Sequence, residues 1–481
     1  MTRLIRTLTV VAGVLIALGG GTFVVLRASA RLGQATAGRL DITSTSVGRT
    51  DVSGTSPGTA SSAGSVSTGP TGPKAGEQPK ASPFPALAAL TTKLEAAVAG
   101  TNSCLTVEDS AGRLVYQHQP DAPLIPASTQ KLLVAEAALA ILGPDYRFTT
   151  SVMATTAPVK GQVAGLWLVG GGDPLLATPE FIAATAGRAR VAAYPWTSLA
   201  RLADSVAAAG IKLVAGGIRG DDSFEDRLRF LPVWPPLYQQ QNQIGLLSAL
   251  SVNEGIQFTP PKSPLAQDPP NYAASELARL LQLRKVPVGS APDQVAPTGA
   301  VTVASVTSAP LNQIVEAMLR ASDNWIAELL VRSIDKAGGG TGTTAGGITA
   351  VMRSAGQAGV PLVGVQMDDG SGLSRTNRAT CRELLAALDR ASQAANSPVF
   401  DGLPVAGQSG TLVFRYRGTP VAGKLRAKTG SLDNAGGMVG VMTLATPVRF
   451  AFLDNDIETE TALYSKEDAI VAALAAYPGS G

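Results

Sequence analysis

Histidine and cysteine are nearly absent from this chain of 481 residues, which contains one histidine and two cysteines. The single histidine, His118, excludes metal sites built from several histidines and leaves one candidate for a Ser-His-Asp triad. It stands where a strand is expected to end at the surface, which favours a structural role. Cys104 and Cys381 lack the spacing of metal ligands, and no metal or other cofactor is expected. In an exported protein they could form a disulfide or stay as two buried thiols, and the sequence leaves both open.

A large excess of charge of one sign is also absent. The sequence contains 39 lysine and arginine residues against 36 aspartate and glutamate residues. This near balance implies no polyanionic partner, so nucleic-acid binding is not expected. With 481 residues, the chain is long enough for two or three domains with large apolar cores.

The N-terminal segment carries a long apolar run. Arg3 and Arg6 precede an uncharged, mostly apolar stretch at 7–26. This stretch exceeds the roughly 7–15 residues of a secretory apolar region and matches the roughly 20 that span a bilayer. Because Ala28–Ala30 resembles a cleavage site, residues 1–33 are predicted to be a membrane anchor or a signal segment, with the uncleaved anchor preferred. The folded part is expected at the cell membrane on the extracytoplasmic side, or secreted if the segment is cleaved.

Composition divides the rest of the chain into further parts. Residues 34–83 are rich in Ser, Thr, Gly and Pro and poor in aromatics, which predicts a disordered linker. Residues 84–145 and 291–481 carry most of the helical patterns and several strand patterns, one of them at 413–416. Residues 146–290 combine short strands with glycine-rich turns and are predicted to be a β-rich inserted domain. The whole predicts an α+β fold, with an antiparallel sheet flanked by helices.

A serine and a lysine stand three residues apart at the start of an apolar helical run. On a helix, residues with this spacing share one face, so the Lys131 amine can reach the Ser128 hydroxyl. A serine needs an adjacent base to become a good nucleophile, and a lysine can be that base only when neutral. The spacing alone is not specific, because Ser333 and Lys336 repeat it. Support must come from other residues.

Two further motifs supply candidate partners for Ser128. Of two Ser-x-Asn triplets, Ser251–Asn253 and Ser322–Asn324, the second is preferred because it lies between two predicted helices, where loops present side chains to a cleft. The sequence also contains Lys-Thr-Gly within an extended run. Strand alternation sends Lys428 and Thr429 to opposite faces, and Gly430 is expected to let a ligand backbone approach closely.

The three motifs stand in the order of the Ser-x-x-Lys, Ser-Asp-Asn and Lys-Thr-Gly signature of class A β-lactamases and penicillin-binding proteins. The chain most resembles a class C low-molecular-mass penicillin-binding protein, the D-alanyl-D-alanine carboxypeptidase/endopeptidase family. The resemblance runs from about Phe84 to Ala476, and a large insertion between the first two motifs is typical of that family. It also includes four stretches: Val169–Pro174, Gly220–Phe224, Ser248–Glu254 and Asp369–Arg375.

This resemblance implies a penicillin-binding/β-lactamase-like catalytic domain and a serine-type D-alanyl-D-alanine carboxypeptidase, with DD-endopeptidase activity also open. The substrates would be peptidoglycan stem peptides ending in D-Ala-D-Ala, and β-lactam antibiotics would acylate the same serine. Ser128 would attack the carbonyl between the two D-alanines, and Lys131 would accept its proton. Ser322 would relay a proton to the leaving amine, while Asn324 would hold the substrate amide.

Lys428 and the residues after it have implied roles beside the nucleophile. The Lys428 charge would attract the substrate carboxylate and would disfavour a second positive charge on Lys131. Thr429 would donate a hydrogen bond to that carboxylate. The resemblance assigns the oxyanion hole to the backbone N–H groups of Ser128 and Ser431.

Two positions bear on the side chain of the stem peptide. Arg375 is a candidate for binding its acidic end, with a salt bridge inside the catalytic domain as an equal alternative. The stretch Leu231–Tyr238 departs from the more aromatic, acidic stretch that family members carry near the side-chain pocket. This departure leaves open how a free side-chain amine is recognised. Asp323 is expected to be mainly structural.

Two other functions are weighed against this one. A serine β-lactamase would deacylate through a water held by a glutamate, but no Glu-x-x-Leu-Asn segment lies between Ser322 and Lys428. A catalytically dormant wall-binding or β-lactam-sensing module would have no need to keep Lys131, Asn324 and Lys428 together. Carboxypeptidase and endopeptidase activity share one acyl-enzyme and differ in the leaving amine, so the motifs do not separate them.

Overall fold

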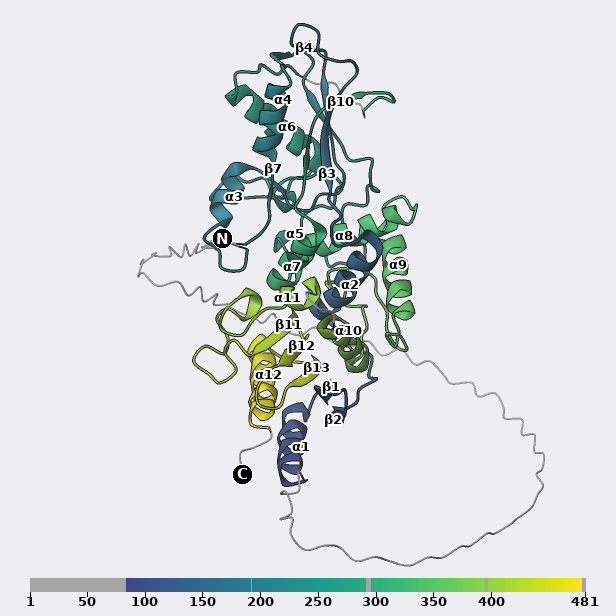
Figure 1. The fold of residues 1–481 in the computed structure, drawn as a ribbon, viewed down its shortest axis with the longest axis vertical. Helices are drawn as coiled ribbons and strands as arrows, with labels where there is room; N and C mark the ends of the chain where they lie inside the picture. Colours follow the sequence, from purple (N-terminus) through teal and green to yellow (C-terminus); the bar gives the residue numbers. More distant parts are fainter. Residues whose placement is uncertain (1–83, 192, 291–295, 394–396, 478–481) are drawn as a thin grey trace, which may run out of the picture. The chain divides into compact units, whose positions relative to one another are not determined.

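The computed structural model describes residues 84–191, 193–290, 296–393 and 397–477 (Figure 1). The anchor or signal segment predicted at 1–33 and the linker predicted at 34–83 lie outside these described residues. Within the described ranges, no helix combines the length and the apolar character needed to cross a membrane.

A five-stranded antiparallel sheet joins the two ends of the described chain. Its strand order is β11-β12-β13-β1-β2, so the strands nearest the C-terminus pair with those nearest the N-terminus. The residues of β12 and β13 are buried along their whole length, which requires cover on both faces. The strands are β1 (Asn102–Asp109), β2 (Leu114–His118), β11 (Leu425–Leu432), β12 (Ala435–Met442) and β13 (Val448–Asn455).

Helices cover both faces of this sheet, which confirms the predicted α+β class. Helices α1 (Phe84–Val98) and α12 (Glu460–Ala475) pack together on one face, where Phe450 and Phe452 of β13 point. The alternate residue Leu453 faces the opposite side, toward α10 (Cys381–Gln393). This alternation is the two-residue period of a strand with two buried faces.

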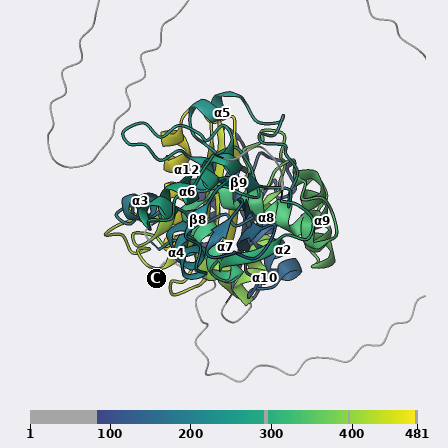
Figure 2. The same cartoon turned by 90° about the horizontal axis from the view of Figure 1, so that it is seen from above.

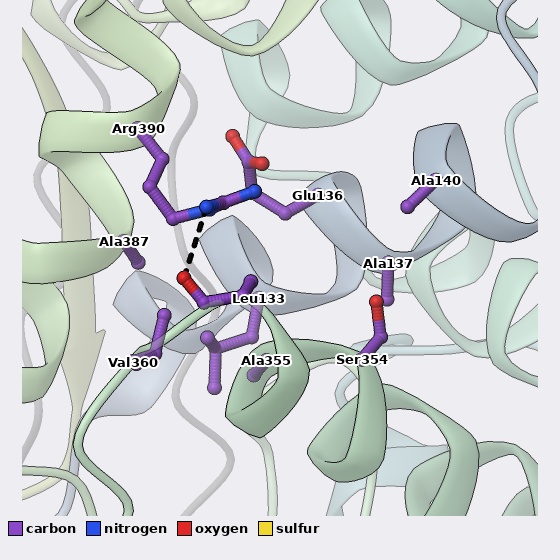
Figure 3. Close-up of a pocket in the computed structure, with 10 residues that line it drawn as sticks. Leu133, Glu136, Ala137, Ala140, Ser354, Ala355, Val360, Ala387 and Arg390 are labelled. Atoms are coloured by element: carbon purple, nitrogen blue, oxygen red, sulfur yellow. Dashed lines mark hydrogen bonds between the residues drawn. The ribbon is translucent and has the colours of Figure 1, made fainter.

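The helical layer on the α10 side is built around α2 (Lys131–Leu142), which the short 3-10 segment η1 (Ala127–Gln130) precedes. Helix α2 is apolar on nearly all sides, as a helix in the middle of a core must be. It contacts α8 and α9 (Figure 2). On its outer side, Leu133 and Glu136 border a small cavity shared with α9 and α10, where Arg390 donates to the Ala358 carbonyl (Figure 3). The other helical elements of this layer are α7 (Leu311–Ala321), α8 (Asn324–Ala337), α9 (Thr344–Gln357), α11 (Pro398–Gly402) and η3 (Gly410–Leu412).

The segment between α2 and α7 forms a second sheet with its own apolar core. The sheet order is β10-β3-β5-β9, and its last strand in the chain, β10, follows the predicted domain end at residue 290. Helices α4 and α6 pack on this sheet (Figure 1). The elements are β3 (Thr149–Ala154), β4 (Gln162–Val163), β5 (Leu166–Val169), β6 (Leu176–Ala177), α3 (Pro179–Thr185), β7 (Thr197–Ser198), α4 (Leu199–Ala208), β8 (Leu213–Val214), β9 (Ile218–Asp221), α5 (Leu237–Gln240), η2 (Asn253–Gly255), α6 (Pro269–Leu283) and β10 (Val301–Thr307).

The strand predicted at 413–416 was wrong. These residues form turns after η3, and Tyr416 adopts a left-handed backbone with φ +63°. Arg415 in this stretch is held by ion pairs to Glu467 and Asp468 of α12 instead of by strand pairing. Side-chain contacts to a distant helix therefore override the local strand pattern.

The two cysteines form a disulfide that links the sheet to a helix. Cys104 of β1 and Cys381 at the start of α10 are fully buried, with their Cα atoms 5.9 Å apart. The bond closes a sequence separation of 277 residues. The disulfide is thus formed, and the alternative of two buried thiols does not hold. The bond fixes the chain a short distance after the segment Asp369–Arg375.

Removing this disulfide is expected to lower the free energy of unfolding by about 4 kcal/mol, because a cross-link over so long a loop strongly restricts the unfolded chain. Urea denaturation of the C104A/C381A variant beside the oxidised wild type measures the difference. A reductant present throughout unfolding should bring the wild type down to the level of the variant and leave the variant unchanged. Equal midpoints for variant and oxidised wild type would contradict the expectation.

Candidate active site

The serine-lysine pair lies at the junction of η1 and α2, next to β11 and β12 of the five-stranded sheet. Ser128 is half-buried in η1, and Lys131 at the start of α2 is fully buried. The Lys131 Nζ donates to Ser128 Oγ at 2.7 Å, to Asn324 Oδ1 at 2.8 Å and to the Ser371 carbonyl at 2.5 Å. The amine is thus fixed beside the hydroxyl by two acceptors that come from distant parts of the chain.

A strained turn presents Ser128. Ala127, immediately before it, has φ +48°, a conformation that residues with a Cβ adopt rarely. Two glycines make room for this turn. A Cβ on Gly372 would lie 2.0 Å from the Ala127 carbonyl oxygen, and one on Gly430 would lie 2.8 Å from the Pro126 oxygen. Gly430 also lines the cleft beside Ser128, so its role in letting a ligand backbone approach closely stays a prediction.

Burial changes the proton affinity of both lysines. Burial lowers the pKa of Lys131 to about 8, against the opposing charges of Asp369, Asp323 and Glu328. It also lowers the pKa of Lys428 well below its ordinary value, and the charge of Lys131 adds to that effect. The main cause of a neutral Lys131 is thus removal from water. The Lys428 charge, which was expected to disfavour a second positive charge on Lys131, is not among the causes that act on the Lys131 pKa.

The Ser-Asp-Asn triplet joins the same site at the junction of α7 and α8. Ser322 adopts a left-handed backbone with φ +62°, and its Oγ accepts from Lys428 Nζ at 2.8 Å. Asn324 contacts Lys131 through Oδ1 and donates through Nδ2 to the Gln243 carbonyl at 3.0 Å. Asp323 caps α8 by accepting from the Ile326 amide. Together these contacts bring Ser128, Lys131, Ser322, Asn324 and Lys428 into one site.

A polar cleft of about 430 Å³ opens beside Ser128. Thr429, Gly430 and Ser431 form part of its wall, and the hydroxyls of Thr429 and Thr411 are hydrogen-bonded at 2.7 Å. Other residues along the cleft come from the inserted segment, from the stretch after η3 and from α12. The lining residues are Ser128, Arg190, Gln243, Ala321, Ser322, Asn324, Thr411, Arg415, Thr429, Gly430, Ser431, Glu460, Tyr464 and Glu467.

Arg375 is not among the residues that line this cleft. Its guanidinium donates to the Asp433 carbonyl at 2.5 Å, and its charge acts on the nearby Tyr238. Tyr238 belongs to the stretch Leu231–Tyr238 that departs from the family pattern. A role of Arg375 in binding the stem-peptide side chain stays a prediction.

The second Ser-x-Asn triplet, Ser251–Asn253, and the second serine-lysine spacing, Ser333 and Lys336, lie outside the site. Asn253 is fully buried, and its Oδ1 accepts from the Thr178 amide at 2.9 Å. Ser333 is buried on α8, while the Lys336 Nζ lies 5.2 Å from the centre of the Phe224 ring instead of next to that serine. Neither motif pairs a lysine amine with a serine hydroxyl.

Sequence reasoning missed a buried polar group around Ser371. Asp369 accepts from Gln130 of η1 and from Trp234 of the inserted segment. Glu328 of α8 accepts from the amide of Ser371 at 2.7 Å. Asp369 stood in a stretch that carried the family resemblance, but without a role. Glu328 could have been noticed because it follows Asn324 by four residues, which places both on one face of α8.

Comparison with known proteins identifies the family. The family model described as D-Ala-D-Ala carboxypeptidase 3 (S13) matches residues 86–260 and 261–477. The chain belongs to this family. The match confirms the prediction of a class C low-molecular-mass penicillin-binding protein. It includes the five-stranded sheet, the helices around it and the inserted segment.

Curated relatives and a solved structure support the same assignment. A carboxypeptidase of Mycobacterium tuberculosis is 35% identical over 357 residues, covering 72% of this chain and 74% of that protein. The D-alanyl-D-alanine carboxypeptidase of Actinomadura sp. (strain R39) is 30% identical over 80% of this chain and 82% of its own length. Penicillin-binding protein 4 of Haemophilus influenzae superposes with a TM-score of 0.67 at 20% identity, over 81% of this chain and 99% of that chain. At that identity the structural likeness shows the fold alone.

Proposed function

We propose that this protein is a serine-type D-alanyl-D-alanine carboxypeptidase that hydrolyses peptidoglycan stem peptides through an acyl-enzyme on Ser128. The observation that carries the proposal is the 2.7 Å contact between Lys131 Nζ and Ser128 Oγ, with the pKa of Lys131 lowered by burial to about 8. A lysine with such a pKa is partly neutral near pH 7–8 and can act as a base. The Actinomadura relative is a D-alanyl-D-alanine carboxypeptidase, which supports the same reaction.

Acylation follows from the contacts around Ser128. Neutral Lys131 takes the hydroxyl proton as Ser128 Oγ attacks the carbonyl carbon between the two D-alanines. The carbon–nitrogen bond then breaks, and the leaving amine needs a proton. Ser322, which lines the cleft and is hydrogen-bonded to Lys428, delivers that proton, and the proton that Lys131 took from Ser128 replaces it. In the second step, neutral Lys131 takes a proton from water as the water oxygen bonds to the ester carbon. Lys131 returns this proton to Ser128 Oγ as the ester carbon–oxygen bond breaks and the shortened peptide leaves.

Other groups of the cleft bind and polarise the substrate. The amides of Ser128 and Ser431 supply the oxyanion hole, and the Thr429 hydroxyl in the cleft wall donates to the terminal carboxylate. Asn324 holds Lys131 with its oxygen, and its Nδ2 has a second hydrogen for the substrate amide carbonyl. Arg375 receives an acidic group on the stem-peptide side chain.

β-Lactams acylate Ser128 in this proposal because their strained amide presents a carbonyl and a carboxylate to the same groups. A structure of Haemophilus influenzae penicillin-binding protein 4 contains a β-lactam, and its fold matches with a TM-score of 0.63. Slow hydrolysis of the resulting adduct would distinguish this protein from a β-lactamase.

The test uses a stem pentapeptide and a cross-linked muropeptide dimer with the full-length protein, and mass analysis of the products. Loss of one D-alanine from the pentapeptide is expected, and conversion of the dimer to monomers would add endopeptidase activity. Absence of both products, with penicillin still bound, would favour a dormant sensing module. Rapid sustained penicillin hydrolysis would favour a β-lactamase.

We also propose that the protein is held at the cell membrane by residues 7–26, with its catalytic part on the extracytoplasmic side. The uncharged apolar run supports an anchor, and the proposed substrate lies outside the cytoplasm. Fractionation of cells that produce the full chain tests this proposal. Recovery in the membrane fraction is expected, while a shortened protein in the medium would indicate cleavage.

A further inference from the structure

Glu328 is a fully buried acidic residue on α8 without a role in the mechanism above. It lies one helical turn beyond Asn324, whose Oδ1 accepts from Lys131 Nζ at 2.8 Å. Residues four apart lie on one face of a helix, so both side chains point toward the start of α2. Burial of a carboxyl group is costly unless its contacts compensate, so those contacts need an explanation.

The contacts of Glu328 lead directly to the base. Its Oε1 accepts from the amides of Gly370 at 2.9 Å and of Ser371 at 2.7 Å. The Ser371 carbonyl in turn accepts from Lys131 Nζ at 2.5 Å and from Ser128 Oγ at 3.4 Å. Ser371 therefore connects the Glu328 carboxyl, through its amide, to the Lys131 amine and the Ser128 hydroxyl, through its carbonyl.

The orientation of the Ser371 carbonyl is fixed from both sides. Glu328 holds the amides that precede this carbonyl, and Asp369 Oδ1 accepts from the Gly372 amide at 2.9 Å. The Gly372 nitrogen and the Ser371 carbonyl belong to one planar peptide group, so holding one directs the other. Loss of either acceptor would let this carbonyl turn away from Lys131.

We infer that Glu328 is a positioning residue for the serine-lysine pair, holding the Ser371 carbonyl where it receives the Lys131 amine beside Ser128. The inference rests on the function proposed above, because it assumes that Lys131 is the base for Ser128. Glu328 is not among the residues that line the cleft and acts through Ser371.

The charge state of Glu328 also bears on Lys131. Burial raises the pKa of the Glu328 carboxyl to about 8, with the Asp369 charge as the next cause, while the hydrogen bonds from Ser371 and then the Arg332 charge act in the opposite direction. Near neutral pH the carboxyl is therefore mostly uncharged. When it ionises at higher pH, its negative charge favours the protonated form of Lys131.

Other charged groups face Lys131 as well. Asp369 and Asp323 raise its pKa alongside Glu328, against the larger effect of burial. Lys428 lies close enough for the charge of Lys131 to lower its own pKa. Removing the ionisable group at 328 should therefore shift the Lys131 titration without abolishing it.

Two substitutions separate positioning from charge. E328Q keeps a carbonyl oxygen for both amides but cannot ionise, so the midpoint of the Lys131 titration should move to lower pH by about 0.5 unit or more. The pH profile of Ser128 acylation by a fluorescent penicillin should shift the same way, with the plateau rate nearly unchanged. E328L leaves both amides without an acceptor, and its acylation rate should fall at least about tenfold.

The full-length protein with isotope-labelled lysine allows the Lys131 titration to be followed by NMR, with K131M to assign the signal. E383Q is the matched control, because Glu383 is also fully buried, its pKa is raised by burial to about 8, and it is not among the groups that act on Lys131. It should leave the midpoint unchanged. An unchanged midpoint in E328Q, or wild-type acylation by folded E328L, would overturn the inference. Failure of the wild type to release D-alanine would instead count against the proposed function, since the titration needs no substrate.

Discussion

Replacement of Lys131 with methionine is expected to slow acylation of Ser128 by a β-lactam about 10³-fold. Proton transfer to a positioned base typically contributes 10²–10⁴-fold to a rate, and the Lys131 amine is the group that contacts Ser128 Oγ at 2.7 Å. Methionine is similar in length and suits the buried position, where Lys131 is 0% exposed. The second-order rate constant with a fluorescent penicillin measures the effect.

Lys336 provides the matched control for this substitution. It follows Ser333 with the same spacing, but its Nζ contacts the Phe224 ring. Ser128 of the K336M protein should therefore be acylated by the fluorescent penicillin at the wild-type rate. A folded K131M protein that keeps more than about a tenth of the wild-type rate would contradict the assignment of Lys131 as the base.

Replacement of Asp369 with alanine is expected to lower the free energy of unfolding by about 3–5 kcal/mol, because several buried donors would lose their acceptor at once. Asp369 is fully buried, and its carboxylate accepts hydrogen bonds from six groups. These donors connect the nucleophile turn, the inserted segment and the loop that carries Ser371. They are Gln130 Nε2, Trp234 Nε1, Ser371 Oγ, the Gly372 and Ser374 amides and Asn377 Nδ2.

Thermal and urea denaturation of D369A measure this loss. Asp368 is the natural control, because it precedes Asp369 directly but binds Gln366 and Thr376 at the surface. D368A should lose less than about 1 kcal/mol, as is usual for an exposed polar contact. Equal stability of D369A and D368A would show that the Asp369 contacts contribute little to folding.

The motifs could be predicted from the sequence because their chemistry depends on short spacings. Ser128 and Lys131 share a helical turn, and the Ser-Asp-Asn triplet lies at a junction between helices, so each was recognisable locally. The α+β class followed from the separation of helical and strand patterns. These features need little knowledge of long-range packing.

The supporting contacts could not be predicted because they join residues far apart in the chain. No local pattern separates Glu328 from the other polar positions of α8, and the fold brings it to Ser371. The side chains of Cys104 and Cys381 are likewise brought together by the packing of α10 against β1, which no local pattern contains. Gly430 was recognised as a place of close approach, but the sequence did not show that the Pro126 backbone also packs against it.

The inserted segment makes hydrogen bonds to residues around the active site. Trp234 donates to Asp369 at 2.7 Å, Gln243 accepts from Asn324 at 3.0 Å, and Tyr194 donates to Asp323 at 2.7 Å. The inserted segment therefore supplies hydrogen-bond partners to Asp369, Asn324 and Asp323, and the short motifs do not contain these partners.

Ser128 is proposed to form the acyl-enzyme in D-alanyl peptide hydrolysis. Wild type and S128A are therefore compared by intact-protein mass analysis with penicillin, together with D-alanine release from a stem pentapeptide. We expect one penicillin adduct per wild-type chain, located on the peptide that contains Ser128, and neither an adduct nor D-alanine release with S128A. D-alanine release by folded S128A, or an adduct on another residue, would contradict the proposal.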